Sequence, residues 1–272
     1  TKSHTGTQET FEFKTQLDVK NLDFRYAGTN TDVLNNISFS IKQGMFIGVT
    51  GSSGAGKSTL IDLVLGLLQP NSGEILLDGR AVNTRASQWR SMFGYVPQEI
   101  SLIDDSIRRN IALGIIDEEI DNGKINEAIH LAAIQDIVGA LPDGHETAVG
   151  EWGAKFSGGQ RQRIGIARAL YRDAKILIMD EVTSALDTKT EKQIVDTLRK
   201  LAGEKTVIVI AHRLSTVQNC DLLLYMDNGK LIDTGTFDEL RDKNSEFAEM
   251  VRYAEITGST IGAHATDPAN VN

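Results

Sequence analysis

The sequence is short of the residues that hold small secreted or metal-bound domains together. Cys220 is the only cysteine, and no set of cysteines and histidines has metal-ligand spacing. One cysteine cannot form an internal disulfide, so a disulfide framework and a zinc module are both excluded. The reducing cytosol is therefore the expected compartment, and Cys220 is expected to be an ordinary packing residue.

The sequence also lacks long apolar runs and an excess of positive charge. No stretch approaches the ~18 consecutive apolar residues that cross a bilayer, so the chain is not expected to span a membrane unaided. Lysine and arginine number 28 against 37 acidic residues, which gives a formal net charge of −9. Nucleic acid and anionic lipid need clustered basic residues, so neither is an expected partner.

What the sequence does contain is a glycine-rich loop between a strand pattern at 45–50 and a helical pattern at 60–68. The loop fits G-x-x-x-x-G-K-[ST] and consists of Gly51, Ser52, Ser53, Gly54, Ala55, Gly56, Lys57 and Ser58. Such a loop cradles the phosphates of a nucleotide with backbone N–H groups and a helix N-terminus. We expect Lys57 to reach the β- and γ-phosphates, Ser58 to ligate Mg²⁺, and Thr59 to belong to the same site.

A second glycine-rich stretch lies far downstream and opens another helical pattern. It consists of Phe156, Ser157, Gly158, Gly159 and Gln160. The Ser157 hydroxyl, the glycine N–H groups and the helix dipole together predict a second anion site. In isolation, such a run is more often a helix N-cap and a turn.

Taken together, the two stretches resemble the ABC ATPases, the nucleotide-binding domains of ATP-binding cassette transporters. The resemblance covers 17–253. It implies an α/β fold, in which a P-loop ATPase core with a mostly parallel sheet carries an antiparallel β subdomain and an inserted α-helical subdomain. It also implies a head-to-tail pair of domains that holds ATP and Mg²⁺ between the phosphate loop of one copy and Ser157–Gln160 of the other. Phe156 replaces the family leucine and keeps an apolar anchor.

An apolar strand pattern at 176–179 ends in two acids, Asp180 and Glu181, and resembles the second nucleotide motif of the family. A buried strand explains the apolar residues but not two carboxylates at its tip. Asp180 is expected to contact Mg²⁺ through water. Glu181 is expected to be the general base that deprotonates the attacking water.

Further positions take their roles from the resemblance alone. Gln98, which follows Tyr95-Val96-Pro97, would touch Mg²⁺ and the attacking water. His212 would contact the γ-phosphate and hold Glu181 in position. Tyr26 would stack on adenine, and its alternative is an ordinary strand tyrosine. Residues 184–187 resemble the D-loop, which crosses the dimer interface.

The pattern along the chain predicts one folded domain between two tails. Residues 1–13 are expected to be a tail or linker, 14–256 the nucleotide-binding domain with a helical subdomain at about 98–163, and 257–272 a disordered tail. Helices within the subdomain are expected at 106–113, 124–131 and 134–141. Strands are expected from 17 and 37 onward and at 74–77, 92–96, 175–180, 206–210, 222–226 and 230–233.

Residues 147–153 resemble the segment that marks exporter-type domains, with Trp152 where the family often has arginine. The predicted function is therefore the ATPase domain of an ABC exporter at the cytoplasmic face of the inner membrane. Its partners would be a second nucleotide-binding domain, in a homodimer or heterodimer, and transmembrane domains. The latter would dock in a groove beside Gln98, floored by Ile100, Leu102 and Ile103.

Three alternatives remain open or disfavoured. A soluble ABC ATPase without a transport role would share the motifs, but it usually has a long coiled-coil insertion or a second cassette, which this sequence lacks. A regulatory cassette would bind ATP without turnover, yet such domains typically lose the base or the glycine-rich signature. A P-loop GTPase is disfavoured because the sequence has no N-K-x-D motif.

Overall fold

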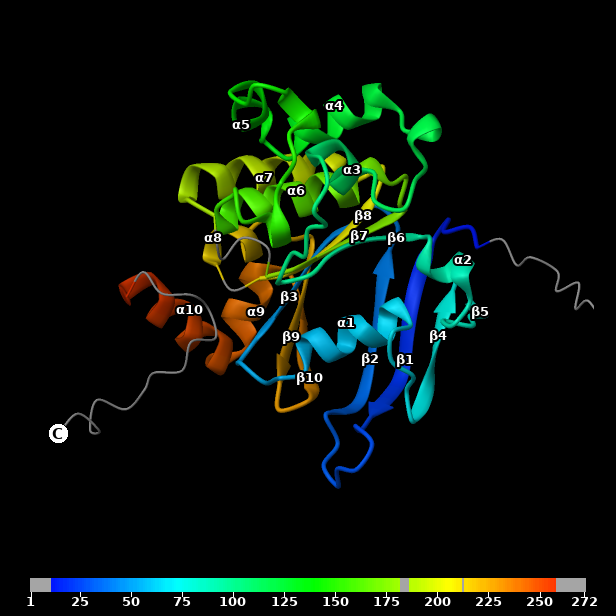
Figure 1. The fold of residues 1–272 in the computed structure, drawn as a ribbon. Helices are drawn as coiled ribbons and strands as arrows, with labels where there is room; N and C mark the ends of the chain where they lie inside the picture. Colours follow the sequence, from blue (N-terminus) through cyan, green and yellow to red (C-terminus); the bar gives the residue numbers. More distant parts are fainter. Residues whose placement is uncertain (1–10, 182–185, 212, 258–272) are drawn as a thin grey trace, which may run out of the picture.

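The computed structural model describes residues 11–181, 186–211 and 213–257, and its central element is a six-stranded sheet (Figure 1). The strand order is β10-β9-β3-β8-β7-β6. The five parallel strands are β3 (Phe46–Gly51), β6 (Phe93–Val96), β7 (Ile176–Asp180), β8 (Thr206–Ile210) and β9 (Leu222–Asp227). The sixth strand, β10 (Lys230–Gly235), is antiparallel to β9. The phosphate-loop strand β3 therefore lies inside the sheet, between β9 and β8.

The central strands β3, β7 and β8 are buried at every position because both of their faces are covered. In β7, Leu177 and Met179 belong to one core cluster, whereas Ile176 and Ile178 belong to the other. Successive side chains of a strand point to opposite faces, so a strand buried on both sides shows a continuous apolar run instead of alternation. The carboxyl ends of these strands form the edge at which the predicted site residues lie.

One face of this sheet is covered by a four-stranded antiparallel sheet and by helix α1 (Lys57–Leu65). The antiparallel sheet has the order β2-β1-β4-β5, with β1 (Gln16–Phe24), β2 (Leu34–Lys42), β4 (Ser72–Leu77) and β5 (Arg80–Ala81). The short helix α2 (Ser87–Arg90) lies beside it in Figure 1. The expected antiparallel β subdomain is confirmed, although the sequence did not predict β5.

Helices cover the opposite face. The layer contains α3 (Ile107–Ile111), α4 (Asn122–Leu131), α5 (Gln135–Gly139), α6 (Gly158–Tyr171) and α7 (Thr188–Leu201), with the 3-10 turns η1 (Asp117–Glu119), η2 (Gly144–Glu146) and η3 (Glu151–Gly153). Near the end of the chain follow α8 (Leu214–Val217), α9 (Phe237–Lys243) and α10 (Ser245–Thr257). Within the described ranges, no helix has the length and apolarity needed to cross a bilayer. Cys220 is buried, as its expected packing role requires.

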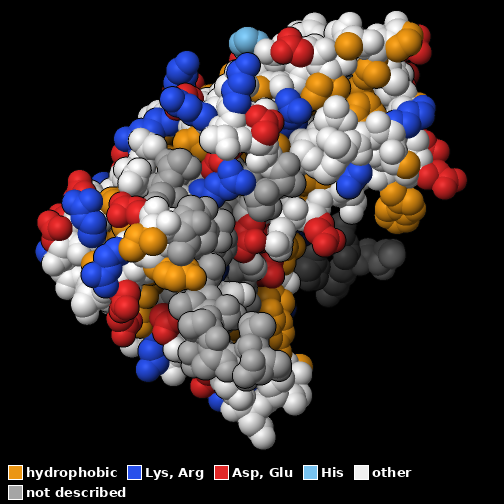
Figure 2. Space-filling model, turned by 90° about the vertical axis from the view of Figure 1, so that its left-hand side faces the viewer, with side chains coloured by type: hydrophobic (Ala, Val, Ile, Leu, Met, Phe, Trp, Pro, Cys, Tyr) orange, Lys and Arg blue, Asp and Glu red, His pale blue; other side chains and the backbone are white. Residues whose placement is uncertain are grey.

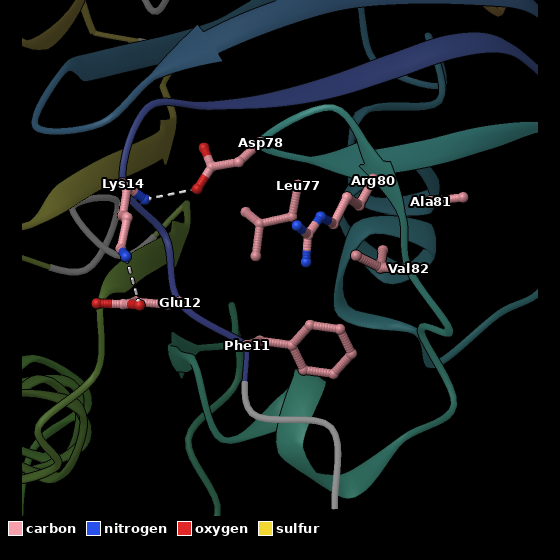
Figure 3. Close-up of a pocket in the computed structure, with 8 residues that line it drawn as sticks. All are labelled: Phe11, Glu12, Lys14, Leu77, Asp78, Arg80, Ala81 and Val82. Carbon is pink, nitrogen blue, oxygen red and sulfur yellow. Dashed lines mark hydrogen bonds and ion pairs between the residues drawn. The ribbon is translucent and has the colours of Figure 1, made fainter.

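The folded part begins earlier than residue 14, so the predicted boundary of the N-terminal tail is corrected. Phe13 is buried in the core, and the Phe11 ring packs edge-on against Trp89 with the ring centroids 5.6 Å apart. The Asp78 carboxylate accepts backbone N–H groups of Lys14, Thr15 and Gln16 at 2.8–2.9 Å. Figure 3 shows Phe11, Lys14 and Asp78 around a cavity of about 420 Å³ at this point. These contacts attach the N-terminal segment to α2 and to the β4–β5 turn.

Candidate functional site

The phosphate loop leaves β3 at a glycine that no other residue can replace without moving the backbone. Gly51 has φ 145°, and a Cβ atom placed on it would lie 1.8 Å from the carbonyl oxygen of Met226 on the neighbouring strand β9. At the other end of the loop, Gly56 has φ 93° and is the N-cap of α1, for which no described side chain forms a cap. The first N–H groups of α1 therefore point toward the loop, where they and the helix dipole favour an anion.

Lys57 is folded back over this loop. Its side chain is 6% exposed, and Nζ donates hydrogen bonds to the carbonyl oxygens of Gly51 at 3.0 Å and Ser52 at 2.8 Å. Burial lowers the pKa of Lys57, and the nearby charges of Glu181 and Asp180 oppose this shift. The ammonium group is thus held at the phosphate loop by weak carbonyl acceptors, which a phosphate group would replace with a charged partner.

The carboxylate of Asp180 lies at the end of β7, beside the start of α1. Burial raises its pKa, as does the charge of Glu181, whereas the hydroxyl groups of Ser58 and Tyr95 lower it. The hydroxyl of Tyr95 donates to Oδ2 at 3.4 Å. The other oxygen, Oδ1, is buried and has no hydrogen-bond partner among the described residues. An unpaired polar atom in the interior is costly, so this oxygen favours a bound water, metal ion or other polar partner.

Glu181, the next residue, is half-buried and has a left-handed backbone with φ 52°. Its Oε2 accepts a hydrogen bond of 2.8 Å from Nε2 of Gln98. A positive φ is unfavourable for a residue with a Cβ atom, and outside turns such residues cluster at functional sites. The structure thus brings Gln98 and Glu181 together, beside Lys57 and Asp180.

The second glycine-rich stretch forms the N-terminus of α6. Ser157 is the N-cap: its Oγ accepts the N–H of Gln160 at 3.3 Å, while the Gln160 side chain accepts the N–H of Ser157 at 2.9 Å. Ser157 and Gly158 are exposed, whereas Phe156 is buried as the apolar anchor. The side chains of α6 and α1 belong to different core clusters on opposite faces of the sheet, so the two helices pack in separate layers. The exposure of Ser157 and Gly158 leaves the N-terminus of α6 open to solvent. The Ser157 hydroxyl, which accepts a hydrogen bond within the cap, still has a hydrogen to donate.

Tyr26 lies beside the start of α1. Its ring is 43% exposed and packs edge-on against Phe24, and its hydroxyl is 3.2 Å from the hydroxyl oxygen of Thr59. An exposed aromatic ring next to a phosphate loop is well placed to stack on a nucleobase. Its stacking role stays a prediction.

Two predicted parts of the site lie outside the described residues. These are His212 and the first half of the D-loop, Ser184 and Ala185. The sequence reasoning gave no role to two residues that the structure adds. One is Tyr95, which contacts Asp180, and the other is Asp227, which accepts a 2.6 Å hydrogen bond from the Ser52 hydroxyl. For Tyr95, the sequence signal was a tyrosine within an apolar strand. For Asp227, the sequence carried no such signal.

Comparison with known proteins identifies the family. Residues 34–184 match the family model described as ABC transporter. This chain belongs to the ABC transporter family. Within that family it is the ATP-binding, ATPase domain, homologous to the corresponding part of exporters, and the α/β fold predicted from the sequence is confirmed.

The relatives are longer than this chain. It is 42% identical over 248 residues to an ATP-dependent lipid A-core flippase of Saccharophagus degradans, covering 91% of this chain and 42% of that protein. The protein of the same name in Pseudomonas aeruginosa is 44% identical over 246 residues, with 90% and 41% covered. A solved bacterial Atm1-family ABC exporter with ATP bound superimposes with a TM-score of 0.83 at 37% identity, over 89% of this chain and 42% of that one. This ABC domain thus spans less than half the length of these relatives.

The groove predicted beside Gln98 exists, but its floor differs from the expectation. A cavity of about 470 Å³ is lined by Gln98 and Ile100, together with residues of η3 and α6. Leu102 is only 3% exposed and belongs to the core cluster under the helical layer, so it is not part of the floor. Ile103 is exposed but does not line the cavity. The close spacing of Ile100, Leu102 and Ile103 in the sequence suggested that they share one surface. In the structure the loop turns Leu102 into the core instead.

Proposed function

We propose that this domain binds and hydrolyses Mg²⁺-ATP at the interface between two copies, and that this cycle powers export by an attached membrane domain at the cytoplasmic face of the inner membrane. One observation carries the proposal. A lysine, an unpaired buried carboxylate oxygen and a hydrogen-bonded Gln98–Glu181 pair converge at one sheet edge, while the glycine-rich helix N-terminus of α6 stays open to solvent. A complete ATPase site needs both halves, which favours a second copy as the source of the missing one.

The residues at the sheet edge fit a magnesium ion bound together with phosphate. Oδ1 of Asp180 is the orphaned acceptor, and the Ser58 hydroxyl lies near the same carboxylate. No group of three or more His, Cys, Asp or Glu side chains suited to a metal occurs in the described part of the chain, so nucleotide oxygens would complete the shell. Mg²⁺ would neutralise phosphate charge there. Gln98 is the further proposed ligand.

We assign the catalytic roles to four side chains. Glu181 accepts the proton of the attacking water, and Gln98 orients both of them through its 2.8 Å hydrogen bond. Lys57 exchanges its two carbonyl acceptors for phosphate oxygens. His212 holds the γ-phosphate side of the site, a role that rests on the family resemblance.

Opening and closing of the pair follows from charge. Two surfaces that each carry a triphosphate approach only when lysine, backbone amides and helix ends neutralise the phosphates. After hydrolysis the contacts of the γ-phosphate with Ser157 and the glycines are lost, and the pair opens. The proposal makes the α6 N-terminus the sensor of the partner's nucleotide.

A trapped dimer tests this proposal. In a Glu181→Gln background, which should lower hydrolysis by at least ~10²-fold while ATP still binds, ATP should convert the chain from monomer to dimer in light scattering. Adding Gly158→Glu places a negative charge where the partner's phosphates would sit, and dimerisation should be lost. A Cβ atom at Gly158 meets no other atom within 4 Å, so the substitution is tolerated sterically.

Gly139→Glu is the matched control, because this helical glycine also has open space around its Cβ position. The control should dimerise normally. A dimer that persists in Gly158→Glu would refute the shared site. Absence of turnover in the wild type would instead favour the regulatory cassette.

A nucleic-acid-dependent role, the soluble alternative, finds little support on the face shown in Figure 2. On the face in Figure 2, lysine and arginine side chains are interspersed with aspartate and glutamate. Nucleic-acid binding usually needs a clustered basic face.

A further inference from the structure

The turn between β9 and β10 lies against the phosphate loop. Asp227 pairs with Lys230 across the hairpin, so Asn228 and Gly229 form a two-residue turn. Both turn residues have positive φ, 45° and 73°, as a type I′ turn requires. A turn of this type has a defined backbone shape, which suits it to hold a neighbouring segment in place.

Backbone contacts join this turn both to the phosphate loop and to the segment that leads into β2. The N–H of Gly229 donates to the carbonyl oxygen of Ala55 at 3.2 Å, and its own carbonyl oxygen accepts the N–H of Asn35 at 2.9 Å. A Cβ atom on Gly229 would lie 2.3 Å from the carbonyl oxygen of Val33, so only glycine permits this approach. The turn is therefore fixed on two sides, and one of them is the phosphate loop.

The side chain of Asp227 holds the first half of the phosphate loop. Its Oδ1 accepts a 2.6 Å hydrogen bond from the Ser52 hydroxyl, and its Oδ2 accepts another of 2.6 Å from the side-chain amide of Asn228. Both oxygens of the carboxylate are engaged, and the turn itself supplies one of the two donors. Hydrogen bonds to an ionised carboxylate are short and strong, so the position of Ser52 is tied to that of the turn.

Ser52 has a second contact, which nucleotide binding would remove. Its carbonyl oxygen accepts a 2.8 Å hydrogen bond from Nζ of Lys57, and phosphate oxygens would take over that ammonium group. The hydrogen bond between the Ser52 hydroxyl and Asp227 is not part of this exchange. An acidic side chain beside a phosphate site repels the ligand, a cost that the positioning of Ser52 would offset.

We propose that Asp227 is a positioning residue for nucleotide binding, which holds Ser52 and the first half of the phosphate loop in the conformation that receives the phosphates. The proposal rests on the nucleotide binding proposed above and deepens it. A loop that is already ordered loses less conformational entropy when its ligand binds, so the hydrogen bond raises affinity. Asp227 acts through Ser52 and not by contact with the nucleotide.

Isothermal titration calorimetry with Mg²⁺-ADP tests the proposal, because ADP has no γ-phosphate to hydrolyse. Asp227→Ala should weaken ADP binding about threefold to tenfold, since the lost hydrogen bond to a charged group outweighs the repulsion that is relieved. Asp227→Asn keeps an oxygen acceptor for Ser52 and removes the charge, so its affinity should equal or exceed that of the wild type.

Asp233→Ala is the matched control on the same hairpin. The Asp233 carboxylate accepts the N–H of Thr234 at 2.8 Å, so this variant also removes one acid and one hydrogen bond. Its affinity for ADP should stay at the wild-type value. The calorimetric stoichiometry counts the folded fraction, so a merely structural role of Asp227 would appear as fewer binding sites at unchanged affinity.

A Ser52→Ala background shows whether Asp227 acts through Ser52. No hydroxyl remains there to be held, so Asp227→Ala should no longer weaken ADP binding in that background. Three results would each overturn the proposal: unchanged ADP affinity in Asp227→Ala, an Asp227→Asn variant as weak as Asp227→Ala, or a weakening that persists without the Ser52 hydroxyl. Failure of the proposed function would show separately, as a wild type that binds ADP but does not hydrolyse ATP.

Discussion

The side-chain amide of Gln98 donates a 2.8 Å hydrogen bond to the carboxylate of Glu181. The two residues meet because β6 and β7 are neighbouring parallel strands in which Val96 pairs with Met179. Each of the two residues lies just past the carboxyl end of its strand, so the strand register sets their contact. In a domain that hydrolyses ATP, this hydrogen bond fixes the orientation of the carboxylate that we assign as the base.

Removing the amide of Gln98 should therefore slow hydrolysis more than it weakens ATP binding. Gln98→Ala is expected to lower kcat by about 10- to 100-fold, because a positioned general base contributes roughly 10²–10⁴-fold. Gln98→Glu should be more severe, since it places a second negative charge against Glu181. Steady-state kinetics and equilibrium ATP binding separate the two effects. Glu99→Gln, at the adjacent exposed position, is the control and should keep the wild-type kcat.

Lys57 should lower the stability of the nucleotide-free domain and raise its affinity for ATP. Burial lowers the pKa of its ammonium, so the charged form costs the native state free energy at neutral pH. Lys57→Met should raise the melting temperature of the nucleotide-free domain by about 2–4 °C, the shift that ~1 kcal/mol produces at this size. The same variant should weaken ATP binding by at least about tenfold, because a charge-assisted contact is lost.

The pH dependence checks the cause of that gain. As the pH rises through the lowered pKa of Lys57 toward its ordinary 10.5, the folded wild type releases the proton and the penalty disappears. The stability difference between wild type and Lys57→Met should therefore shrink in alkaline solution. A constant difference from neutral to alkaline pH would mean that packing, not the buried charge, separates the two proteins.

Asp180 should show the opposite pH profile. Burial and the charge of Glu181 raise its pKa from 3.8, so at neutral pH its ionised form lowers the stability of the nucleotide-free domain. Asp180→Asn should be more stable than wild type at pH 7. This advantage should vanish as the pH falls through the raised pKa toward 3.8, where both side chains are neutral. Denaturant unfolding between pH 4 and 7 measures it, with Asp173→Asn as an exposed control that lacks the gain.

Much of the fold could be predicted because its strands carry a local signal. The expected strand at 175–180 is confirmed as β7 at Ile176–Asp180, since burial on both faces makes the run apolar without interruption. The N-terminal boundary was wrong because Phe11 and Phe13 stand among polar and charged residues, which hide the start of the strand pattern that continues at Leu17 and Val19. The packing partner of Phe11, Trp89, is far away in the sequence, and only the folded chain brings the two rings to 5.6 Å.

The candidate site shows the same limit. The phosphate loop and the acids at 180–181 follow from short motifs with a chemical reason for each residue. The contact of Tyr95 with Asp180 depends on the register between β6 and β7, where Tyr95 pairs with Ile178, and no local pattern encodes that register. The cavity beside Gln98 likewise combines three separate segments, so its lining could not be predicted from any one of them.

Tyr26 provides a test of the nucleobase position. If its exposed ring stacks on adenine, Tyr26→Ala should weaken ATP binding by about tenfold, since stacking on an aromatic side chain contributes ~1–3 kcal/mol. Tyr26→Phe keeps the ring and loses only the hydroxyl contact with Thr59, so its affinity should stay near that of the wild type. Equal weakening in both variants would assign the effect to the Thr59 contact and reject stacking.

Gly165 and Ile100 join the Gln98 loop to α6 through a close contact. A Cβ atom on Gly165 would lie 2.5 Å from Cδ1, 2.9 Å from Cγ1 and 3.2 Å from Cγ2 of Ile100. Gly165→Ala should therefore destabilise the domain. Overpacking costs about 1–3 kcal/mol, against a gain of about 1 kcal/mol in helix propensity. The expected net loss is about 0–2 kcal/mol, which urea unfolding would measure.

The sign of the effect should reverse when the isoleucine is removed. In an Ile100→Ala background the clash is absent and the helix propensity remains, so Gly165→Ala should stabilise by about 1 kcal/mol. Gly139→Ala is the matched control, because its Cβ position is open and the gain should be of similar size with or without Ile100. A destabilising Gly165→Ala in both backgrounds would mean that another neighbour, such as the backbone of α6, limits the space. A reversal would establish Ile100 as the residue that keeps the Gln98 loop in register with the helix that begins at Ser157.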